Sequence, residues 1–464
     1  MTTTTVLNVL DNDICVGCGG CGVATLGRIP IRMSEMGIYQ ADAAGATAED
    51  LTAASSVCPF ANESPNEDQL AAERFGDDMP VDVRLGRYAG LYAARITGSD
   101  EVVQSSSGGM TTWILKRLME TGRVDGVIHV APSNGALFEY VVSESVDELL
   151  MGRKSRYFPA SFDRTVLSIR GNGRRYAFVG VPCAVRAARS VVKTDDVLRQ
   201  QLRFFVGLVC GHMKSAAYAE SFAWQLGIGP DRLASVDFRV KNPGLLSRQY
   251  SFGARSIDGD WQTSQTIDLV GGSWGHAVFQ LNACNFCDDI FAETADVVCG
   301  DAWLPRFEAE WRGTNVVVTR SAEIDALLRD APADEIWLEE LTPDAVAETQ
   351  AGNFRHRREG LAVRLADDDK VGRWRPKKRV AADASAVTAR RRSLIRQRRA
   401  LSDASHPLFL KARLANDLGL YLDAITPMIE RYDKVSRPNL YSRLQKRAAR
   451  EYWKLRRKMR RQNR

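Results

Sequence analysis

The stretch that organises this chain reads Cys15-Val16-Gly17-Cys18-Gly19-Gly20-Cys21, and a distant Cys58-Pro59 pair completes it. Its three cysteines recur at every third position, with glycines between them. Glycine permits the positive φ values of a tight turn, so the three thiols can converge on one centre. Backbone amides in such a turn point inward and favour an anion. The four cysteines therefore predict a negatively charged metal centre.

The spacing of these cysteines favours iron and sulfide over zinc. A C-x-x-C-x-x-C run with a remote Cys-Pro is half of the bacterial ferredoxin pattern, in which the run and the remote cysteine hold one 4Fe-4S cluster. The local cysteine that would serve a second ferredoxin cluster is missing, because Ala24 and Thr25 occupy that neighbourhood. Zinc sites usually contain two C-x-x-C pairs. We expect one 4Fe-4S cluster, with structural zinc as the alternative, on Cys15, Cys18, Cys21 and Cys58.

Length and composition are those of an ordinary globular protein. The 464 residues are 45% hydrophobic and 26% charged, which allows two or three domains. No run of about 18 apolar residues predicts a membrane span, and the first residues lack the basic and apolar segments of a secretory signal. We expect a cytoplasmic protein whose nine cysteines are reduced thiols or metal ligands.

Charge divides the chain into two regions. Residues 371–464 carry 27 Lys and Arg against 7 Asp and Glu, a net charge of +20, whereas residues 1–370 carry 36 against 50, a net charge of −14. Apolar residues recur at helical spacing near the end, at Leu440, Leu444, Ala448, Tyr452, Leu455 and Met459. A basic amphipathic helix predicts docking on the acidic body, on a protein partner or on an anionic membrane surface. Nucleic acid is disfavoured, because no recognition motif accompanies the charge.

Between these regions, strand patterns alternate with helix patterns, which predicts an α/β layer architecture. Strands are expected at residues 91–96, 124–130, 175–180, 204–209, 236–241, 295–299 and 316–319, and helices at 110–121, 215–226, 274–281 and 322–329. The segment Ser105–Gly109 lies between a strand and a helix. That layout can place an anion at a helix N-terminus, although an ordinary helix cap is the alternative.

Five cysteines remain outside the first motif. Cys183 and Cys210 follow predicted strands, where α/β sheets place their ligands, and Cys284 and Cys287 form a C-x-x-C pair. These four predict a second metal centre, with a second 4Fe-4S cluster preferred over zinc because an electron relay needs a next step. Cys299 falls inside an apolar strand and is interpreted as a small buried residue.

These segments resemble the beta subunit of coenzyme F-420-reducing hydrogenase and dehydrogenase, a family that also includes 7-hydroxymethyl chlorophyll a reductase. The resemblance covers roughly residues 10–320, including the cysteine run. It is carried, in the family's order, by Ser105–Gly109, Ser155–Tyr157 with Ser161, Gly180–Cys183, Gly207–Cys210, Phe238-Arg239, Cys284–Asp289 and Gly300-Asp301.

The resemblance implies an oxidoreductase that binds FAD on the α/β domain. The implied cofactor contacts are Ser106, Ser107, Gly108, Gly109, Lys154, Ser155, Arg156, Tyr157, Ser161 and Asp301. Helix N-terminal amides and Arg156 suit a pyrophosphate. The family often has lysine at the position of Arg156, so Lys154 is the alternative cation. Arg239 and Lys241 are candidates for binding an acidic substrate or the deazaflavin tail. The alternative is that both are ordinary surface charges on a strand.

We therefore expect a mixed α/β fold (α+β) in three parts. A ferredoxin-like cluster module with its connector occupies residues 1–82, a FAD-binding and second-cluster catalytic domain 83–370, and a basic, mostly helical extension 371–464.

The expected function follows from electron counting. Clusters carry one electron each, so FAD would be the exchange point between two 4Fe-4S clusters and a two-electron substrate. That substrate is a small organic molecule or coenzyme F-420, and ferredoxin is the other candidate electron partner. The alternatives are an electron-relay subunit without its own substrate and a zinc-stabilised interaction protein. A homo-oligomer and a peripheral membrane location are compatible with the sequence.

Overall fold

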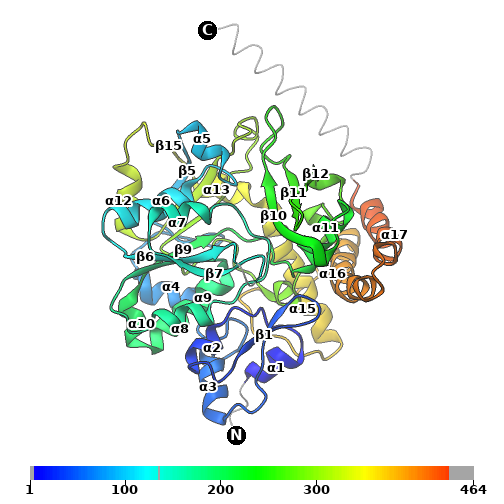
Figure 1. The fold of residues 1–464 in the computed structure, drawn as a ribbon. Coiled ribbons are helices and arrows are strands. Elements are labelled where there is room, and N and C mark those ends of the chain that lie inside the picture. The colour runs from blue at the N-terminus through cyan, green and yellow to red at the C-terminus, as the bar shows by residue number, and fades with distance from the viewer. Residues whose placement is uncertain (1–4, 134–135, 438–464) are drawn as a thin grey trace.

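The centre of the molecule is an eight-stranded mixed sheet with the order β15-β5-β14-β13-β9-β8-β6-β7 (Figure 1). The computed structural model describes residues 5–133 and 136–437. The strands of this sheet are β5 Gly90–Ile96, β6 Gly126–Ala131, β7 Glu139–Ser143, β8 Tyr176–Gly180, β9 Leu202–Leu208, β13 Val297–Asp301, β14 Asn315–Thr319 and β15 Ile336–Glu340. The expected mixed α/β fold is confirmed.

Strand direction brings several chain segments to one edge of this sheet. β6, β8, β9 and β13 pair in parallel, so their C-terminal ends lie together. β14 is antiparallel to both β13 and β5, and β5 therefore points the same way as β13. The loops that follow these five strands meet at the edge where open α/β sheets bind ligands.

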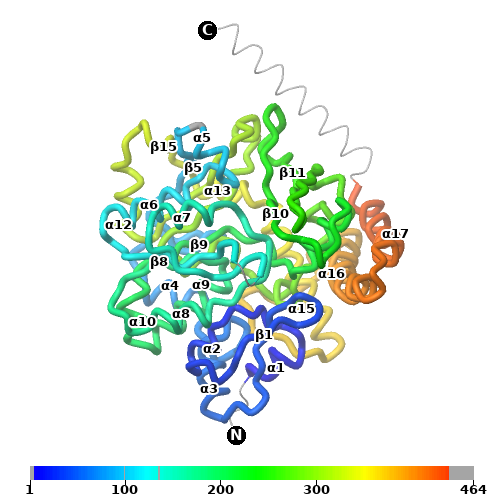
Figure 2. The backbone as a smooth tube through the Cα atoms, viewed as in Figure 1, coloured from blue at the N-terminus to red at the C-terminus, as the bar shows by residue number. Residues whose placement is uncertain are grey.

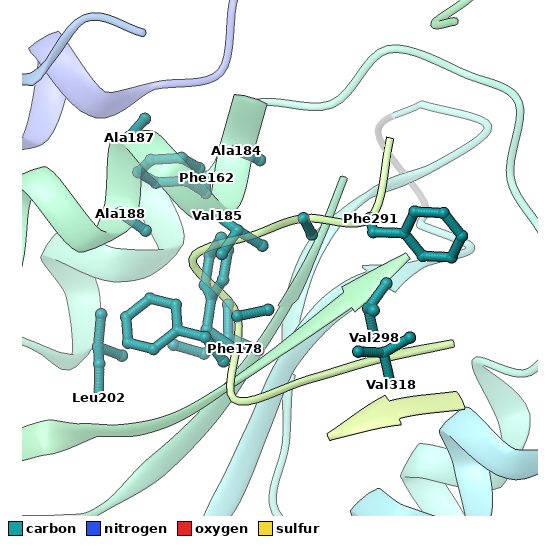
Figure 3. Packing of buried hydrophobic residues seen from close by; sticks show 14 of the residues in the cluster. Phe162, Phe178, Ala184, Val185, Ala187, Ala188, Leu202, Phe291, Val298 and Val318 are labelled. Atoms are coloured by element: carbon teal, nitrogen blue, oxygen red, sulfur yellow. The ribbon is translucent and has the colours of Figure 1, made fainter. Parts of the chain in front are cut away.

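Both faces of the sheet are buried, which explains why its strands read as nearly continuous apolar runs. Along β5, Leu91 and Ala93 belong to one core cluster, whereas Tyr92 and Ala94 belong to the other. This alternation follows from the two-residue period of a strand. Figure 3 shows the first cluster, which includes Phe178 of β8 and side chains from β9, β13 and β14.

Helices cover the two faces and fill the connections. α9 contributes to the first core cluster and α6 to the second. The helices are α1 Thr5–Asp11, α2 Gly20–Ala24, α3 Ala48–Val57, α4 Glu67–Phe75, α5 Ser99–Val103, α6 Met110–Glu120, α7 Val146–Met151, α8 Asp163–Ile169, α9 Pro182–Thr194, α10 Asp196–Gln201, α11 Ala217–Gln225, α12 Ala322–Arg329, α13 Pro343–Thr349, α14 Ala351–Phe354, α15 Gly360–Lys370, α16 Ala389–Ala415 and α17 Leu418–Ser436.

The N-terminal segment packs beside the central sheet (Figure 1). It contains α1, α2, α3 and a hairpin of β1 Ile31–Met33 and β2 Tyr39–Ala41. The backbone N–H of Phe162 donates to the carbonyl of Cys18 at 2.9 Å. A methyl group on Gly20 would lie 3.1 Å from the Cβ of Ala187 on α9. The cysteine run is therefore in close contact with the helix that begins beside Cys183.

A second, three-stranded sheet lies beside the first and packs against the C-terminal helices (Figure 2). It consists of β10 Leu233–Val240, β11 Ser251–Ser256 and β12 Trp261–Gln265. Phe238 and Phe252 from this sheet share a core cluster with Phe409 of α16 and Tyr421 of α17. The short hairpin of β3 Val81–Asp82 and β4 Gly86–Arg87 precedes β5.

The basic extension docks on the acidic body as far as the structure describes it. Lys378 Nζ lies 2.8 Å from Asp288, and Arg379 Nη1 lies 2.7 Å from Glu293. These pairs match the opposite net charges of the two regions. The amphipathic helix expected at residues 440–459 lies outside the described residues.

One expected helix is wrong. Residues 274–281 form a single 3-10 turn at Trp274–His276, because Ala277 and Phe279 adopt positive φ values of 55° and 57°. The other short 3-10 turns are Pro230–Arg232, Thr266–Asp268 and Asn282–Phe286. Among the described helices, none is long and apolar enough to cross a membrane.

Candidate functional site

A cavity of about 360 Å³ opens at the sheet edge where the parallel strands end. Its size is that of a ligand pocket. It is lined at the ends of three strands, by residues 179–181, 183 and 184 (β8), 208–214 (β9) and 299–301 (β13). Residues 105–107, 109–112 and 152–158 also line it. The thiols of Cys18, Cys183 and Cys210 belong to the same lining. One cavity therefore joins the expected cofactor loops to residues of both cysteine sets.

The Ser/Gly loop, residues 105–109, leads into α6 at the cavity. Gly109 has φ 82° and occupies the N-cap position, so its backbone needs glycine. The N–H of Met110 donates to Asn315 Oδ1 at 3.0 Å. Ser106 Oγ accepts from the N–H of Ser155 at 2.6 Å, which ties the two expected cofactor loops together.

The second loop, residues 153–157, presents cations to the cavity. Lys154 has φ 83°, a strained value for a residue other than glycine, and its Nζ lies 2.7 Å from Asp237. Arg156 stacks 4.7 Å above the ring of Phe138, and burial lowers its pKa to about 10. Its Nε is buried without a hydrogen-bond partner among the described residues. A buried guanidinium N–H without an acceptor suits an anionic ligand.

Arg239 and Asp301 form a buried pair at the cavity wall. The guanidinium donates two hydrogen bonds of 3.1 Å to the carboxylate and lies 4.2 Å from the ring centre of Tyr250. Burial alone would lower the pKa of Arg239, but Asp301 outweighs it and raises the pKa. Tyr157 packs edge-on against Phe238, with ring centres 5.4 Å apart. Asp301 therefore fixes Arg239, and both side chains line the cavity.

Three of the expected cofactor and substrate contacts lie outside the cavity lining. Lys241 donates to the carbonyls of Val102, Ser107 and Arg312. Three acceptors use all three hydrogens of an ammonium group, so Lys241 braces the Ser/Gly loop.

The other two, Gly108 and Ser161, also make packing contacts. A methyl group on Gly108 would lie 2.7 Å from the carbonyl of Ala94. Ser161 donates to Asp163 at 2.6 Å, and its Oγ would lie 2.7 Å from a methyl group on Gly19. Ser161 therefore contacts the cysteine run, while Gly108 allows the Ser/Gly loop to approach β5.

The first cysteine set converges as its spacing predicts. Burial raises the pKa of Cys21, and the nearby charges of Cys15, Cys18 and Cys58 raise it further. Burial also raises the pKa of Cys58 to about 11, while the N–H groups of Phe60 and Ala61 oppose this shift. The N–H of Gly17 donates to Cys15 Sγ at 3.4 Å. Four neighbouring thiols with inward backbone N–H groups form a suitable environment for an anionic centre.

The second cysteine set also converges, although its members are far apart in sequence. Burial is the main cause that raises the pKa of Cys183, and the nearby charges of Cys287, Cys210, Cys18 and Cys284 raise it further. The N–H of Met213 donates to Cys284 Sγ at 3.2 Å. Cys18 appears among the neighbours of Cys183, and members of both sets pack in one apolar cluster. The two sets are therefore adjacent.

Each cysteine set offers four thiols as candidate metal donors. Within residues 5–133 and 136–437, no three His, Cys, Asp or Glu side chains are grouped tightly enough to hold one ion. A 4Fe-4S cube is larger than an ion and takes one thiolate at each iron corner. In each set four neighbouring cysteines supply donors of that type and number.

Several cavity residues were missed by sequence reasoning. His212 stacks on Trp274 with ring centres 4.1 Å apart. Arg398 Nη2 donates to Nδ1 of His212 at 3.2 Å. Because Nδ1 accepts, Nε2 carries the hydrogen of the neutral ring, and this buried N–H has no partner among the described residues. The position of His212, just after Cys210 at a strand end, was the available sequence signal.

A second cavity, of about 410 Å³, adjoins the first and is more open. It shares three cations with the first cavity and adds Arg255 and Trp261 from the three-stranded sheet. Asp237 is its acidic member, and that carboxylate is paired with Lys154. The shared cations are Arg153, Lys154 and Arg156.

Comparisons with known proteins match this architecture. The family models for the N-terminal and C-terminal parts of the coenzyme F-420 hydrogenase/dehydrogenase beta subunit match residues 91–166 and 173–344, respectively. One subunit of the F(420)H(2) dehydrogenase of Methanosarcina mazei is 22% identical over 349 residues, which cover 72% of this chain and 87% of the relative. The beta subunit of the coenzyme F-420 hydrogenase of Methanothermobacter thermautotrophicus is 22% identical over 56% of this chain and 88% of the relative.

Two further similarities are more limited. Coenzyme F-420-dependent sulfite reductase of Methanocaldococcus jannaschii is 24% identical over 44% of this chain and 32% of the relative. A chain of the F-420-reducing nickel–iron hydrogenase complex from Methanosarcina barkeri matches 65% of this chain and 99% of its own length, at 18% identity and a TM-score of 0.49. That structural likeness is too distant to carry an argument. The two family models together span the central sheet and the cavity, and the chain belongs to the family of coenzyme F-420 hydrogenase/dehydrogenase beta subunits.

Proposed function

We propose that this chain is a flavin- and iron–sulfur-dependent oxidoreductase. Electrons would pass between two 4Fe-4S clusters and FAD, and between FAD and a small organic substrate or coenzyme F-420. The observation that carries the proposal is the shared cavity, whose lining includes Cys18 and Cys183 as well as both expected cofactor loops. A flavin exchanges single electrons with clusters and electron pairs with organic substrates.

The two loops supply the groups that a flavin dinucleotide requires. The N-terminus of α6 follows the Ser/Gly loop and favours a negative group such as pyrophosphate. Arg156 would donate its unpartnered Nε–H to the same group. Trp274 and Tyr157 form an aromatic part of the cavity wall, with ring centres 5.1 Å apart. His212 supplies a neutral N–H donor. These residues would bind and orient the cofactor and exclude water from it.

The cysteine sets would hold one cluster each. Burial raises the pKa of Cys58 to about 11 and that of Cys210 to about 12, so free thiols there keep their protons at neutral pH. A metal centre binds thiolates and displaces those protons. Because Cys18 and Cys183 are electrostatic neighbours, the two clusters would form a short relay that ends at the cavity.

The substrate would be acidic. Arg153, Lys154, Arg156 and Arg255 line the open second cavity, and the carboxylate of Asp237 is already paired. A carboxylate- or phosphate-bearing molecule could contact these cations while its redox-active part lies in the first cavity. Coenzyme F-420 is the first candidate to test, since it appears in the names of the relatives.

Anaerobic purification tests the proposal. We expect a brown protein with one flavin and about eight iron atoms per chain, matched by labile sulfide. Reduced coenzyme F-420 and reduced ferredoxin should then be titrated separately against the flavin absorbance. A colourless protein that contains zinc without iron or flavin would overturn the proposal and favour the zinc-stabilised interaction protein.

An electron-relay subunit is the second candidate. Two of the relatives are named as subunits of a dehydrogenase or hydrogenase. A relay would bind clusters and flavin, but its flavin would be reduced by a partner chain and by no small organic donor. Flavin reduction in the isolated chain by coenzyme F-420 would exclude the relay; reduction by ferredoxin alone would favour it.

A further inference from the structure

A buried arginine from beyond the matched family models faces the second cysteine set. Arg357 lies on a π-helical turn, Arg355–Glu359, between α14 and α15, whereas the family match ends at residue 344. A π turn inserts an extra residue into a helix and is frequent at functional sites. Arg357 is only 1% exposed. This region therefore places a permanent cation inside the protein.

The contacts of Arg357 place it at the cysteines. Its Nε donates to the carbonyl of Gly211 at 2.8 Å. Its Nη2 donates to the carbonyl of Cys210 at 3.3 Å and lies 3.7 Å from Cys210 Sγ. Its Nη1 is buried without a hydrogen-bond partner among the described residues. Two of its nitrogens thus hold the loop that carries Cys210, and one remains available.

The charge of Arg357 lacks a carboxylate partner. A buried cation is costly unless an opposite charge offsets it, yet the ion pairs formed within residues 5–133 and 136–437 do not include Arg357. Its electrostatic neighbours include Cys287, Cys210, Cys284 and Cys183. A metal centre on these cysteines would bind them as thiolates and so would supply the negative charge that offsets the guanidinium.

A second, half-buried cation supports the first. Arg398 on α16 bonds to His212, and its Nε has no partner among the described residues. Burial lowers the pKa of Arg398 to about 10, and Cys284 is one of its electrostatic neighbours. The first cysteine set has a different environment, because the charge of Asp163 lies near Cys18. Each set also has a charge of the other sign, Arg186 near Cys58 and Asp289 near Cys287, so the contrast rests on the contact of Arg357 with Cys210.

We propose that Arg357, supported by Arg398, raises the reduction potential of a 4Fe-4S cluster on Cys183, Cys210, Cys284 and Cys287 above that of the cluster on the first set. Reduction adds negative charge to a cluster, so a fixed cation nearby stabilises the reduced form. Electrons would then run downhill from the N-terminal module toward the cavity. The proposal rests on the proposed function, since it requires both clusters, and Arg357 acts as a positioning residue.

Potentiometric titration followed by electron paramagnetic resonance tests it, on full-length protein purified anaerobically. Cys58→Ala removes a ligand of the first cluster, so the titration of this variant reports on the second cluster. In this background Arg357→Gln should shift its reduced-to-oxidised ratio at least tenfold toward the oxidised form, about 59 mV for one electron. Arg357→Lys keeps the charge and should recover part of the shift. The matched control is Arg358→Gln on the same turn, because Arg358 lies 3.6 Å from Glu293 and should leave the potential unchanged.

An unchanged potential in Arg357→Gln with full iron would overturn the inference. If that variant loses its iron, Arg398→Gln decides, because Arg398 makes no hydrogen bond to a cysteine among the described contacts. We expect about a threefold shift there from a more distant charge, and no shift would again overturn the inference. Wild-type protein without a second cluster would defeat both this inference and the proposed function, whereas two clusters and a flavin with unshifted potentials would defeat this inference alone.

Discussion

The two cysteine sets are brought together by different routes. Cys15, Cys18 and Cys21 come from one glycine-rich turn, and Cys58 ends α3 as its C-cap residue. Cys183 and Cys210 follow β8 and β9 of the central sheet, whereas Cys284 lies in the 3-10 turn Asn282–Phe286 and Cys287 ends it. The first set has Asp163 nearby, whereas the second faces Arg357. A local motif fixes donors, but long-range packing sets the electrostatic environment.

The largest expected effect is the loss of iron from one cysteine set while the other set keeps its iron. Cys284→Ala should lose about four of about eight iron atoms per chain, because a cube missing one of its four thiolates is destabilised. Iron and labile sulfide analysis of the anaerobic protein measures this. The control is Cys299→Ala, since Cys299 is equally buried but lies within β13. Full iron in the first variant, or half the iron in the control, would show that the second ligand set is wrong.

The next effect concerns the contact between α4 and α9, the helix that begins beside Cys183. Glu67 on α4 forms a buried ion pair of 2.9 Å with Arg186 on α9. Glu67→Gln leaves that arginine without its carboxylate and should lower the free energy of unfolding by about 3 kcal/mol. Urea denaturation under anaerobic conditions measures the loss. The control is Glu73→Gln, which removes an exposed pair with Lys193 between the same helices and should cost less than about 1 kcal/mol.

This contribution depends on pH in a defined direction. Burial alone would raise the pKa of Glu67, but Arg186 and Lys378 outweigh it and lower the pKa from 4.5. A lowered pKa means that the stabilisation is complete above pH 4.5 and is lost as the pH falls through the folded-state pKa. The difference between wild type and Glu67→Gln should therefore shrink in acid. A difference that grows below pH 4.5 would contradict this assignment.

A smaller effect tests the cavity that the second set adjoins. Arg156→Gln removes a buried cation with a free Nε–H and should weaken flavin binding about 10- to 100-fold, as expected for a charged hydrogen bond. Fluorescence titration of the flavin-depleted protein measures the affinity. Arg203→Gln, an exposed substitution on β9, is the control. Equal affinities of the two variants would remove Arg156 from the binding site.

The smallest effect concerns the first set. Asp163→Asn removes a negative charge near Cys18 and should raise the reduction potential of the first cluster. The rise should stay below about 59 mV, which corresponds to less than a tenfold change in the reduced-to-oxidised ratio. The second cluster should keep its potential. A fall in the first potential would contradict the electrostatic contrast between the sets.

The central sheet and the proximity of the cysteines within each set could be predicted because their signals are local or topological. The spacing of Cys15 to Cys21 is itself the motif, and Cys183 and Cys210 follow strands whose ends share an edge. Arg357 could not be predicted, since its position depends on a π turn and on packing against a distant loop. Lys241 was expected at the substrate, but burial directs its ammonium to three carbonyls.

The one misplaced helix has a similar cause. Residues 274–281 have helix-like apolar spacing, yet Ala277 and Phe279 are fully buried with positive φ. Phe279 stacks on Tyr421 of α17, with ring centres 5.5 Å apart. Tertiary packing therefore overrides the local preference, and no short-range pattern reports it.

The direct test of the account is the route by which the flavin is reduced in Cys58→Ala. This variant lacks a ligand of the first set and leaves the cavity intact. We predict that its bound flavin is no longer reduced by reduced ferredoxin, a one-electron donor, but is still reduced by reduced coenzyme F-420, which would deliver a hydride at the cavity. Stopped-flow absorbance with each donor measures both rates. Unchanged reduction by ferredoxin, or loss of reduction by coenzyme F-420 while flavin stays bound, would contradict it.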